Sequence, residues 1–248
     1  MINSFTIIFA SIIIYENKKK FKYCLILIIG FSTTVFSQNT KADDLGAWYM
    51  YFYSTKIKDS KFGIQGDLQY RNFNGLGDLE QLLIRSAVTF TPKNTNITLA
   101  LGVANITSCK IGESSDTTNE SRIYQEVVLP QKVGQRLYLN HRFRYEQRFI
   151  ENQDFRTRFR YNIAASIPLN KLKIEKETIY VTLYNEFFVN GEKNIGNNRT
   201  VSVFDRNRFY AGLGYAESDK VRFQLGFMNQ STENNGKDQL QISMHHNF

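Results

Sequence analysis

The stretch YLNHRFRYEQRFIENQDFRTRFRYNIA, residues 138–164, carries arginine at alternate positions over much of its length, and Phe or Tyr often fills the gaps. Divided by parity, residues 136–149 have one face with Arg136, Tyr138, Asn140, Arg142, Arg144, Glu146 and Arg148. Their other face has Leu137, Leu139, His141, Phe143, Tyr145, Gln147 and Phe149. Side chains alternate between the faces of a strand, whereas a helix would scatter these arginines around its axis. The stretch therefore predicts β-strands with one charged face and one apolar face.

The same alternation continues along most of the chain. It predicts eleven strands, near residues 45–56, 61–72, 79–91, 96–105, 120–130, 134–149, 153–167, 178–190, 204–217, 220–231 and 237–248. Most reach the roughly 9–11 residues that a tilted strand needs to cross a bilayer, whereas strands of soluble proteins average about five or six. Tight connections at TPKN, LPQKVG and AESDK alternate with longer polar ones at NITSCKIGESSDTTNE, NGEKNIGNNRTVS and STENNGKD. Outer-membrane barrels have this asymmetry of short periplasmic turns and long external loops.

Composition fits this interpretation. The chain has 248 residues, which suits one large domain, and its 3 prolines form no linker. A mean hydropathy of −0.37 excludes a bundle of membrane helices. We expect an all-β fold, a single-chain antiparallel transmembrane β-barrel of about 10–12 strands. An even number, 10 or 12, is favoured over 11 because single-chain bacterial barrels usually have even strand numbers. The alternative is an ordinary soluble β-sandwich in which one face of the sheet is exposed to solvent.

The N-terminal region is typical of a secretory signal. Residues 1–37 contain a basic cluster, an apolar run from Tyr23 to about Phe36 and a small residue at Ser37. We place cleavage between Ser37 and Gln38, followed by a short segment 38–44 and a barrel over residues 45–248. A second apolar stretch ahead of the basic cluster suggests that translation starts later than Met1. The predicted location is the cell outer membrane. Only Cys109 remains after cleavage, so a disulfide framework is excluded.

Arginine and lysine occupy different places in the pattern. Lysines past residue 37 lie in turns, loops or strand ends, whereas all arginines past that residue except Arg199 lie in or beside strands, on the polar phase. The planar guanidinium binds carboxylates through two hydrogen bonds, which suits charges that pair in a confined space. We therefore predict a lumen lined by Arg71, Arg85, Arg122, Glu126, Arg142, Arg144, Glu146, Arg148, Arg156, Arg158, Arg160, Glu186, Arg206, Arg208 and Arg222. Asp67 and Asp154 are further expected partners for these arginines.

The last strand predicts how the protein enters the membrane. Counted back from the C-terminus, its apolar phase is Phe248, His246, Met244, Ile242 and Leu240. A final alternating strand that ends in Phe resembles the assembly signal read by the bacterial outer-membrane insertion machinery. The expected partners are therefore outer-membrane lipid and the barrel assembly machinery, and Phe248 is the expected assembly signal.

Other chemistries have weaker support. Nucleic-acid binding is not expected, because the arginines and aromatics lie on opposite faces and cannot grip one strand jointly. His245 and His246 are adjacent in a strand and point to opposite faces, so they cannot share one metal ion. His141 has no evident Ser or Asp partner, and Gly212 and Gly214 are expected to make room for facing arginines. No catalytic, cofactor-binding or metal-binding residue is assigned, and no cofactor is expected.

Several blocks carry a family resemblance. They are LNHRFRYEQRF, FRTRFRYNIAASIPL, YNEFFVN, FDRNRFYAGLGY and LGFMNQ, followed by the terminal strand. Together they resemble the domain of unknown function 2490 family of outer-membrane barrels, from about Leu45 to Phe248. The resemblance implies an outer-membrane barrel with no assigned activity, and it supplies no catalytic residues.

Three functions are consistent with the sequence. The first is a narrow pore or transport barrel that favours small anionic solutes, because polar-phase arginines outnumber the acids beside them. The second is a closed structural barrel, bridged by Arg–carboxylate pairs, that presents loops to the exterior. The third is a lipid-modifying enzyme built in a barrel. The arginine excess favours the first, and we expect no enzymatic activity.

Overall fold

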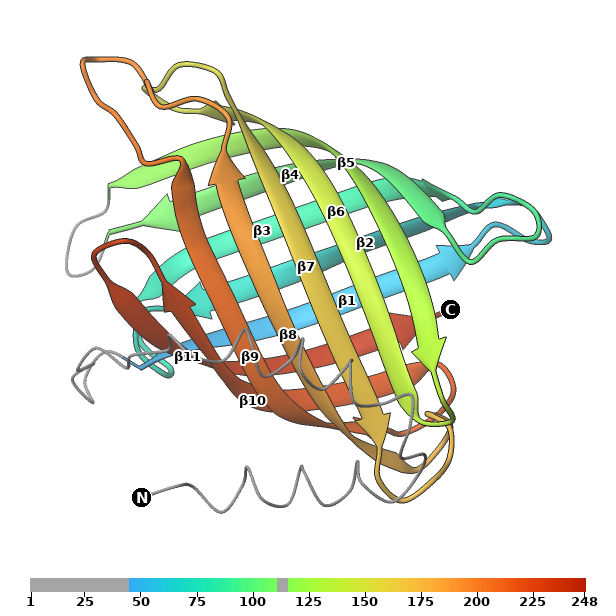
Figure 1. Ribbon diagram of the computed structural model, residues 1–248. Helices are drawn as coiled ribbons and strands as arrows, with labels where there is room; N and C mark the ends of the chain where they lie inside the picture. Colours follow the sequence, from blue (N-terminus) through green and yellow to red (C-terminus); the bar gives the residue numbers. More distant parts are fainter. Residues whose placement is uncertain (1–44, 111–115) are drawn as a thin grey trace, which may run out of the picture. The chain divides into compact units, whose positions relative to one another are not determined.

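The computed structural model describes residues 45–110 and 116–248, which form one closed β-barrel (Figure 1). The predicted signal, its cleavage site and the segment 38–44 lie outside the described residues. None of the described residues belongs to a helix that could span a membrane. All eleven expected strands are present, and most of their bounds lie within three residues of the predicted ones.

The strands follow one another around the wall. They are β1 (Gly46–Lys56), β2 (Phe62–Asn72), β3 (Leu79–Phe90), β4 (Thr98–Cys109), β5 (Thr117–Val133), β6 (Leu137–Ile150), β7 (Arg156–Pro168), β8 (Thr178–Asn190), β9 (Phe204–Ala216), β10 (Val221–Ser231) and β11 (Gly236–Asn247). Cys109, expected in a polar loop, is the last residue of β4 and pairs with Thr117 of β5. Long strands therefore take up much of the sequence that resembled a long loop.

The barrel closes through a parallel pair. Each strand is antiparallel to its neighbours in sequence, but β1 runs parallel to β11, with Gly46 opposite Gln239 and Ser54 opposite Asn247 (Figure 1). An odd number of alternating strands makes the first and last run in the same direction, so only parallel hydrogen bonds can close the ring. The expectations of an even strand number and of a fully antiparallel barrel were therefore wrong. Closure removes both sheet edges, which is what lipid requires of a strand protein.

The two ends of the barrel differ in what they contain. The end where β1 starts, called here the N-terminal end, carries the connections 73–78, 110–116, 151–155, 191–203 and 232–235. The opposite end, called the C-terminal end, carries the connections 57–61, 91–97, 134–136, 169–177 and 217–220 together with Phe248. The longest connection lies at the N-terminal end, but residues 169–177 make the difference between the ends smaller than the sequence pattern indicated.

Alternation places apolar residues on the outer wall. Large exposed side chains recur on every second residue, among them Ile84, Val103, Phe143, Phe159 and Leu225. Along β6, β7 and the residue before β7, aromatic side chains form a ladder of pairs. The ring centroids are 4.7 Å apart for Phe143–Tyr161, 5.0 Å for Tyr145–Phe159 and 5.3 Å for Phe149–Phe155. The arginines of the same strands lie on the inner face. The aromatic and arginine ladders thus occupy opposite sides of one wall.

Glycines on the inner wall lie beneath tyrosine rings. A Cβ atom on Gly214 would lie 2.1 Å from Cζ of Tyr180, and one on Gly102 would lie 2.4 Å from Cζ of Tyr124. The glycine at each position is therefore required by a ring on the neighbouring strand, Tyr180 opposite Gly214 and Tyr124 opposite Gly102. A Cβ on Gly212 would likewise meet the hydroxyl of Tyr210. The expectation that Gly212 and Gly214 make room for arginines was wrong, because tyrosines fill that space.

Candidate functional site

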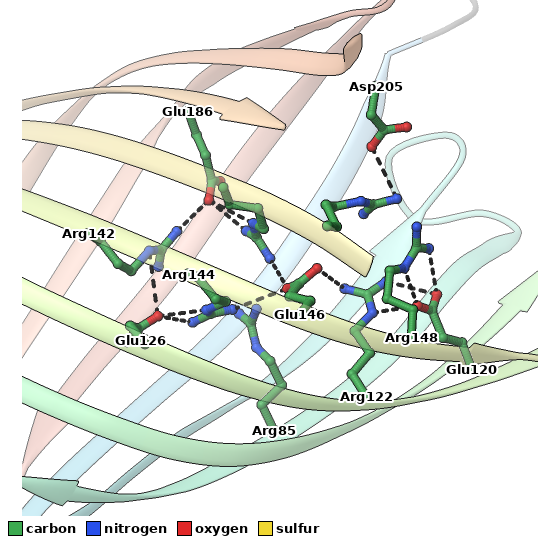
Figure 2. A network of polar contacts seen from close by, with 12 residues as sticks. Arg85, Glu120, Arg122, Glu126, Arg142, Arg144, Glu146, Arg148, Glu186 and Asp205 are labelled. Atoms are coloured by element: carbon green, nitrogen blue, oxygen red, sulfur yellow. Dashed lines mark hydrogen bonds and ion pairs between the residues drawn. The ribbon is translucent and has the colours of Figure 1, made fainter. Parts of the chain in front are cut away.

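The interior of the barrel holds a set of paired charged side chains, called here the interior network (Figure 2). Its carboxylates are Asp67, Glu120, Glu126, Glu146, Glu186 and Asp205. Their arginine partners are Arg85, Arg122, Arg142, Arg144, Arg148, Arg158, Arg160 and Arg206. Most members are buried. Alternation places all of them except Asp205 there, because each of the others occupies the inward phase of a strand.

Some pairs follow directly from strand register. Asp67 of β2 lies opposite Arg85 of β3, and its two oxygens accept hydrogen bonds of 2.8 and 3.0 Å from the guanidinium. Glu126 of β5 lies opposite Arg144 of β6, whose Nε donates to it at 2.6 Å. Two-pronged pairing of this kind fixes both the distance and the orientation of the side chains.

Glu146 lies at the centre of the network. One oxygen accepts a hydrogen bond of 2.6 Å from Arg160 on β7 and lies 3.8 Å from Arg144, and the other lies 3.4 Å from Arg122 on β5. Glu146 itself is on β6 and is only 1% exposed. Figure 2 shows its carboxylate between the labelled guanidinium groups of Arg144 and Arg122. A single carboxylate therefore serves arginines from three adjacent strands.

Glu186 extends the network across a strand. Its Oε1 is 2.7 Å from Nη2 of Arg142 on β6 and 2.7 Å from Nη2 of Arg160 on β7. Register alone would have paired it with Arg208, which lies directly opposite on β9. The long arginine side chains reach past the nearest partner, so register does not determine which charges meet.

The N-terminal end holds the remaining pairs. Glu120 accepts hydrogen bonds from Arg122 at 2.6 Å and from Arg148 at 2.5 Å. Asp205 lies 3.1 Å from Arg158 and 3.0 Å from Arg206. Because Arg158 is on β7 and Asp205 on β9, this pair also reaches over an intervening strand.

Aromatic and amide side chains fill the rest of the interior. The guanidinium carbon of Arg71 lies 3.8 Å from the ring centre of Trp48, and that of Arg208 on β9 lies 4.8 Å from the same ring. Gln65 of β2 donates to Glu126 of β5 at 3.0 Å. The contact of Arg208 with Trp48 and that of Gln65 with Glu126 join strands that are not neighbours. The lumen is therefore bridged and packed by its own side chains at the depth of these residues.

The structure places all twelve predicted lumen arginines on inward-facing positions. Arg142, Arg206 and Arg222 are partly exposed, and the others are buried. Within the described residues, Arg71, Arg156, Arg208 and Arg222 form no ion pair at 4 Å or less; Arg71 and Arg208 instead donate to glutamine side chains. Glu126, Glu146 and Glu186 lie in the interior network.

The predicted carboxylate partners were only partly correct. Asp154 is exposed and lies before the start of β7, outside the interior network, because the strand begins three residues later than the alternation suggested. Glu120 was missed, although it shares parity with Arg122 and the same pattern could have found it. Asp205 was missed for a structural reason. A register shift between Phe188 and Val189 of β8 pairs them with Arg206 and Phe204, so Asp205 is an extra residue that simple alternation misplaces.

Among the described residues, no histidine forms an ion pair with the interior network, although His245 lies in the same row of the wall as Asp67. His245 stacks on Phe52 with ring centroids 4.7 Å apart, whereas His246 lies 3.2 Å from the hydroxyl of Tyr51. Nδ1 of His141 lies 2.8 Å from the hydroxyl of Tyr161. Over the described residues, no group of three or more His, Cys, Asp or Glu side chains is placed to hold a metal ion.

Comparison with known proteins gives one match. The sequence profile of the family described as "Protein of unknown function (DUF2490)" matches residues 45–241. No curated protein and no solved structure matches the chain. The family match covers most of the barrel and confirms the resemblance seen in the arginine-rich blocks. The chain therefore belongs to the DUF2490 family of proteins of unknown function.

Proposed function

We propose that this protein is an outer-membrane β-barrel that is sealed by its interior network and serves as a non-conducting scaffold for the connections at its N-terminal end. The observation that carries the proposal is the burial of Glu146, 1% exposed between arginines from β5, β6 and β7. A channel wide enough for solutes would leave such a carboxylate in contact with water. This is the closed-barrel alternative, which the packed interior favours over the narrow pore.

Placement in a membrane has support from the outer wall. Its exposed side chains include Leu101 and Phe227, about 60% exposed each, on strands whose inward residues are buried. Contiguous apolar surface of this extent on a soluble monomer is rare, whereas a barrel in lipid requires it. The longest connection, residues 191–203, favours the N-terminal end as the external one.

A second function, an anion pathway, is favoured by the charge balance. Arg71, Arg156 and Arg208 are buried without a carboxylate within ion-pair distance among the described residues. A solute route that opens in response to a further signal would be selective for anions. Neither role requires a catalytic side chain.

Single-channel recording on the purified, reconstituted protein separates the two functions. The sealed barrel predicts membranes with inserted protein, checked by protease protection, and no stepwise current. A general porin reconstituted in parallel controls for the sensitivity of the recording. Stepwise current with anion preference would refute the sealed barrel and support the pathway. A product found in the soluble periplasmic fraction would refute both.

Assembly is proposed to use Phe248. Its ring is 62% exposed at the C-terminal end, 4.0 Å from the ring of His246, and its N–H donates to the carbonyl of Ser54 on β1. Deleting Phe248 is expected to lower the amount of protein in the outer membrane, measured against Phe248→Tyr as the matched control. Equal amounts for the two variants and the native chain would remove this role.

A further inference from the structure

Three arginines occupy one row across neighbouring strands near the N-terminal end. Arg148 of β6 lies directly opposite Arg122 of β5 on one side and Arg156 of β7 on the other. All three are inward-facing and buried. Like charges placed directly opposite each other in a sheet are destabilising. The row therefore requires nearby negative charge.

The carboxylates of the described chain supply only part of that charge. Glu120 pairs with Arg122 and Arg148, and Asp205 pairs with Arg158 and Arg206. The side chain of Arg156 has no ion pair or hydrogen bond with any described residue, although Arg156 is only 8% exposed. Glu192 lies in the connection that follows β8. Its carboxylate accepts hydrogen bonds from the backbone N–H and the hydroxyl of Thr157, and not from Arg156.

Donor groups without an acceptor are concentrated at this place. Nη1 of Arg148, Nε of Arg156 and Nε of Arg158 are all buried and have no hydrogen-bond partner among the residues that the structure describes. The three side chains are 4%, 8% and 5% exposed, respectively. A buried charged donor that lacks an acceptor is costly. Three such donors on adjacent positions of β6 and β7 need an acceptor that the described chain does not provide.

From this geometry we infer a binding site for a tetrahedral oxyanion, formed by Arg148, Arg156 and Arg158. A phosphate or sulfate group offers several acceptor oxygens, and guanidinium groups bind such anions through paired hydrogen bonds. The same chemistry is offered by free phosphate and by the phosphate of a lipid headgroup. The site lies at the N-terminal end, since Arg156 is the first residue of β7, and it is compatible with a sealed barrel because a ligand there need not traverse the lumen.

Neighbouring connections hold the site in place. The N–H of Gly191 donates to the carbonyl of Thr157, and the N–H of Asp154 donates to the carbonyl of Ile195. Residues 191–203 therefore pack against the connection 151–155 and the start of β7, beside Arg156. Because these hydrogen bonds fix the connections around the start of β7, the arginine side chains form a preformed site.

The test compares the native protein with Arg156→Gln in detergent. Arg136→Gln is the matched control, because Arg136 is exposed in the connection at the C-terminal end and the change in charge is the same. Unfolding of each protein is followed with phosphate or sulfate, at constant ionic strength set with chloride. At an anion concentration about ten times the dissociation constant, binding lowers the unfolding equilibrium constant about tenfold. We expect this for the native chain and Arg136→Gln, and an affinity about tenfold or more weaker for Arg156→Gln.

In chloride alone, Arg156→Gln should be more stable than the native chain, which is the reverse of the order expected with a bound oxyanion. Without the oxyanion, Arg156→Gln removes repulsion from the row and should unfold at a higher temperature than the native chain. Phosphorus analysis of protein purified from membranes tests the lipid source. Bound phosphorus retained by the native chain and lost in Arg156→Gln supports a headgroup, whereas response to added phosphate without retained phosphorus supports the free ion. Absence of both effects in the native chain, or an equal response in Arg156→Gln, would overturn the site.

Discussion

Two sectors of the wall line the interior of the barrel with different kinds of polar side chain. Strands β5 to β8, the charged sector, present arginines and glutamates that pair across neighbouring strands. Strands β10, β11 and β1, the seam sector, present Gln239, Gln241 and Ser243 with Trp48 and Met228, and they include the parallel closure. The interior of the seam sector is polar but largely uncharged.

The sectors also differ in which polar groups are paired. The carboxylates of the charged sector are all paired, although Nη1 of Arg148 and Nε of Arg156 and Arg158 have no partner among the described residues. In the charged sector every carboxylate has at least two arginine neighbours within ion-pair distance, as Glu126, Glu146 and Glu186 illustrate. In the seam sector Nε1 of Trp48 and both amide atoms of Gln239 have no partner among the described residues. Single substitutions should therefore be severe in the charged sector and mild in the seam sector. The predictions below test that contrast in order of expected effect.

The largest effect is expected for Glu146→Gln. The change keeps the shape of the side chain but removes the charge that lies among Arg122, Arg144 and Arg160. Breaking a buried pair in this way costs about 3–5 kcal/mol, because uncompensated charge remains. Urea unfolding in lipid vesicles, followed by fluorescence of Trp48, the one tryptophan of the chain, measures it.

Glu175→Gln is the matched control for this charge change. Glu175 is exposed at the C-terminal end and lies 3.8 Å from Lys171, a surface pair worth about 0–1 kcal/mol. Similar losses for the two variants would mean that water reaches Glu146, and the sealed interior would then be wrong.

The next effect concerns the outer wall. Phe159 of β7 is 53% exposed on the outer face, so Phe159→Arg should cost roughly 2–4 kcal/mol if it lies near the bilayer midplane. Phe155, just before β7 and therefore near the barrel end, supplies a depth control, with a cost of about 0–1 kcal/mol for Phe155→Arg. The amount of each variant in the outer membrane is the measurement. Normal insertion of Phe159→Arg, combined with failure of Arg158→Leu to insert, would contradict the placement of the outer wall in lipid.

Sequence alternation predicted the wall well because the strand period is two and the chain keeps it over long strands. Arg144 and Phe143 are adjacent, and the structure places them on opposite faces as expected. The closed barrel was predicted, but the parallel pairing of β1 with β11 was not, because the count of eleven strands was set aside for the even number that is usual in single-chain barrels. The choice of partners was also not predictable, since Arg142 reaches Glu186 over an intervening strand. The inward position of Asp205 was not predicted, because the register shift between Phe188 and Val189 of β8 interrupts the alternation there.

A medium effect is expected where glycine accommodates a ring. In Gly214→Ala the new Cβ would lie 2.1 Å from Cζ of the buried Tyr180, whose hydroxyl accepts a hydrogen bond from Gln224 at 3.1 Å. The ring must move, and overpacking of this kind costs about 1–3 kcal/mol. Gly236→Ala is the control, since the nearest atom to its Cβ would be 3.9 Å away. Equal unfolding midpoints for the two variants would show that the Tyr180 ring shifts freely.

The smallest effect is expected in the seam sector, where two glutamines of β11 make a matched pair. Gln239 is 1% exposed, and neither of its amide atoms has a partner in the described part of the chain. Oε1 of Gln241, in contrast, accepts a hydrogen bond of 3.0 Å from the hydroxyl of Tyr184 on β8. Because Gln239 loses no bond, Gln239→Leu should be neutral or stabilising by up to about 1 kcal/mol.

Gln241→Leu leaves the hydroxyl of Tyr184 without its acceptor and should lower the free energy of unfolding by about 1 kcal/mol or slightly more. Unfolding midpoints of the two variants, measured side by side in vesicles, should therefore move in opposite directions or differ clearly. The difference is informative because the two residues share a strand, a face and a side-chain type, so lipid and closure effects cancel. A loss in Gln239→Leu as large as that in Gln241→Leu would mean that the amide of Gln239 is satisfied by water, and the seam would then be hydrated where the charged sector is dry.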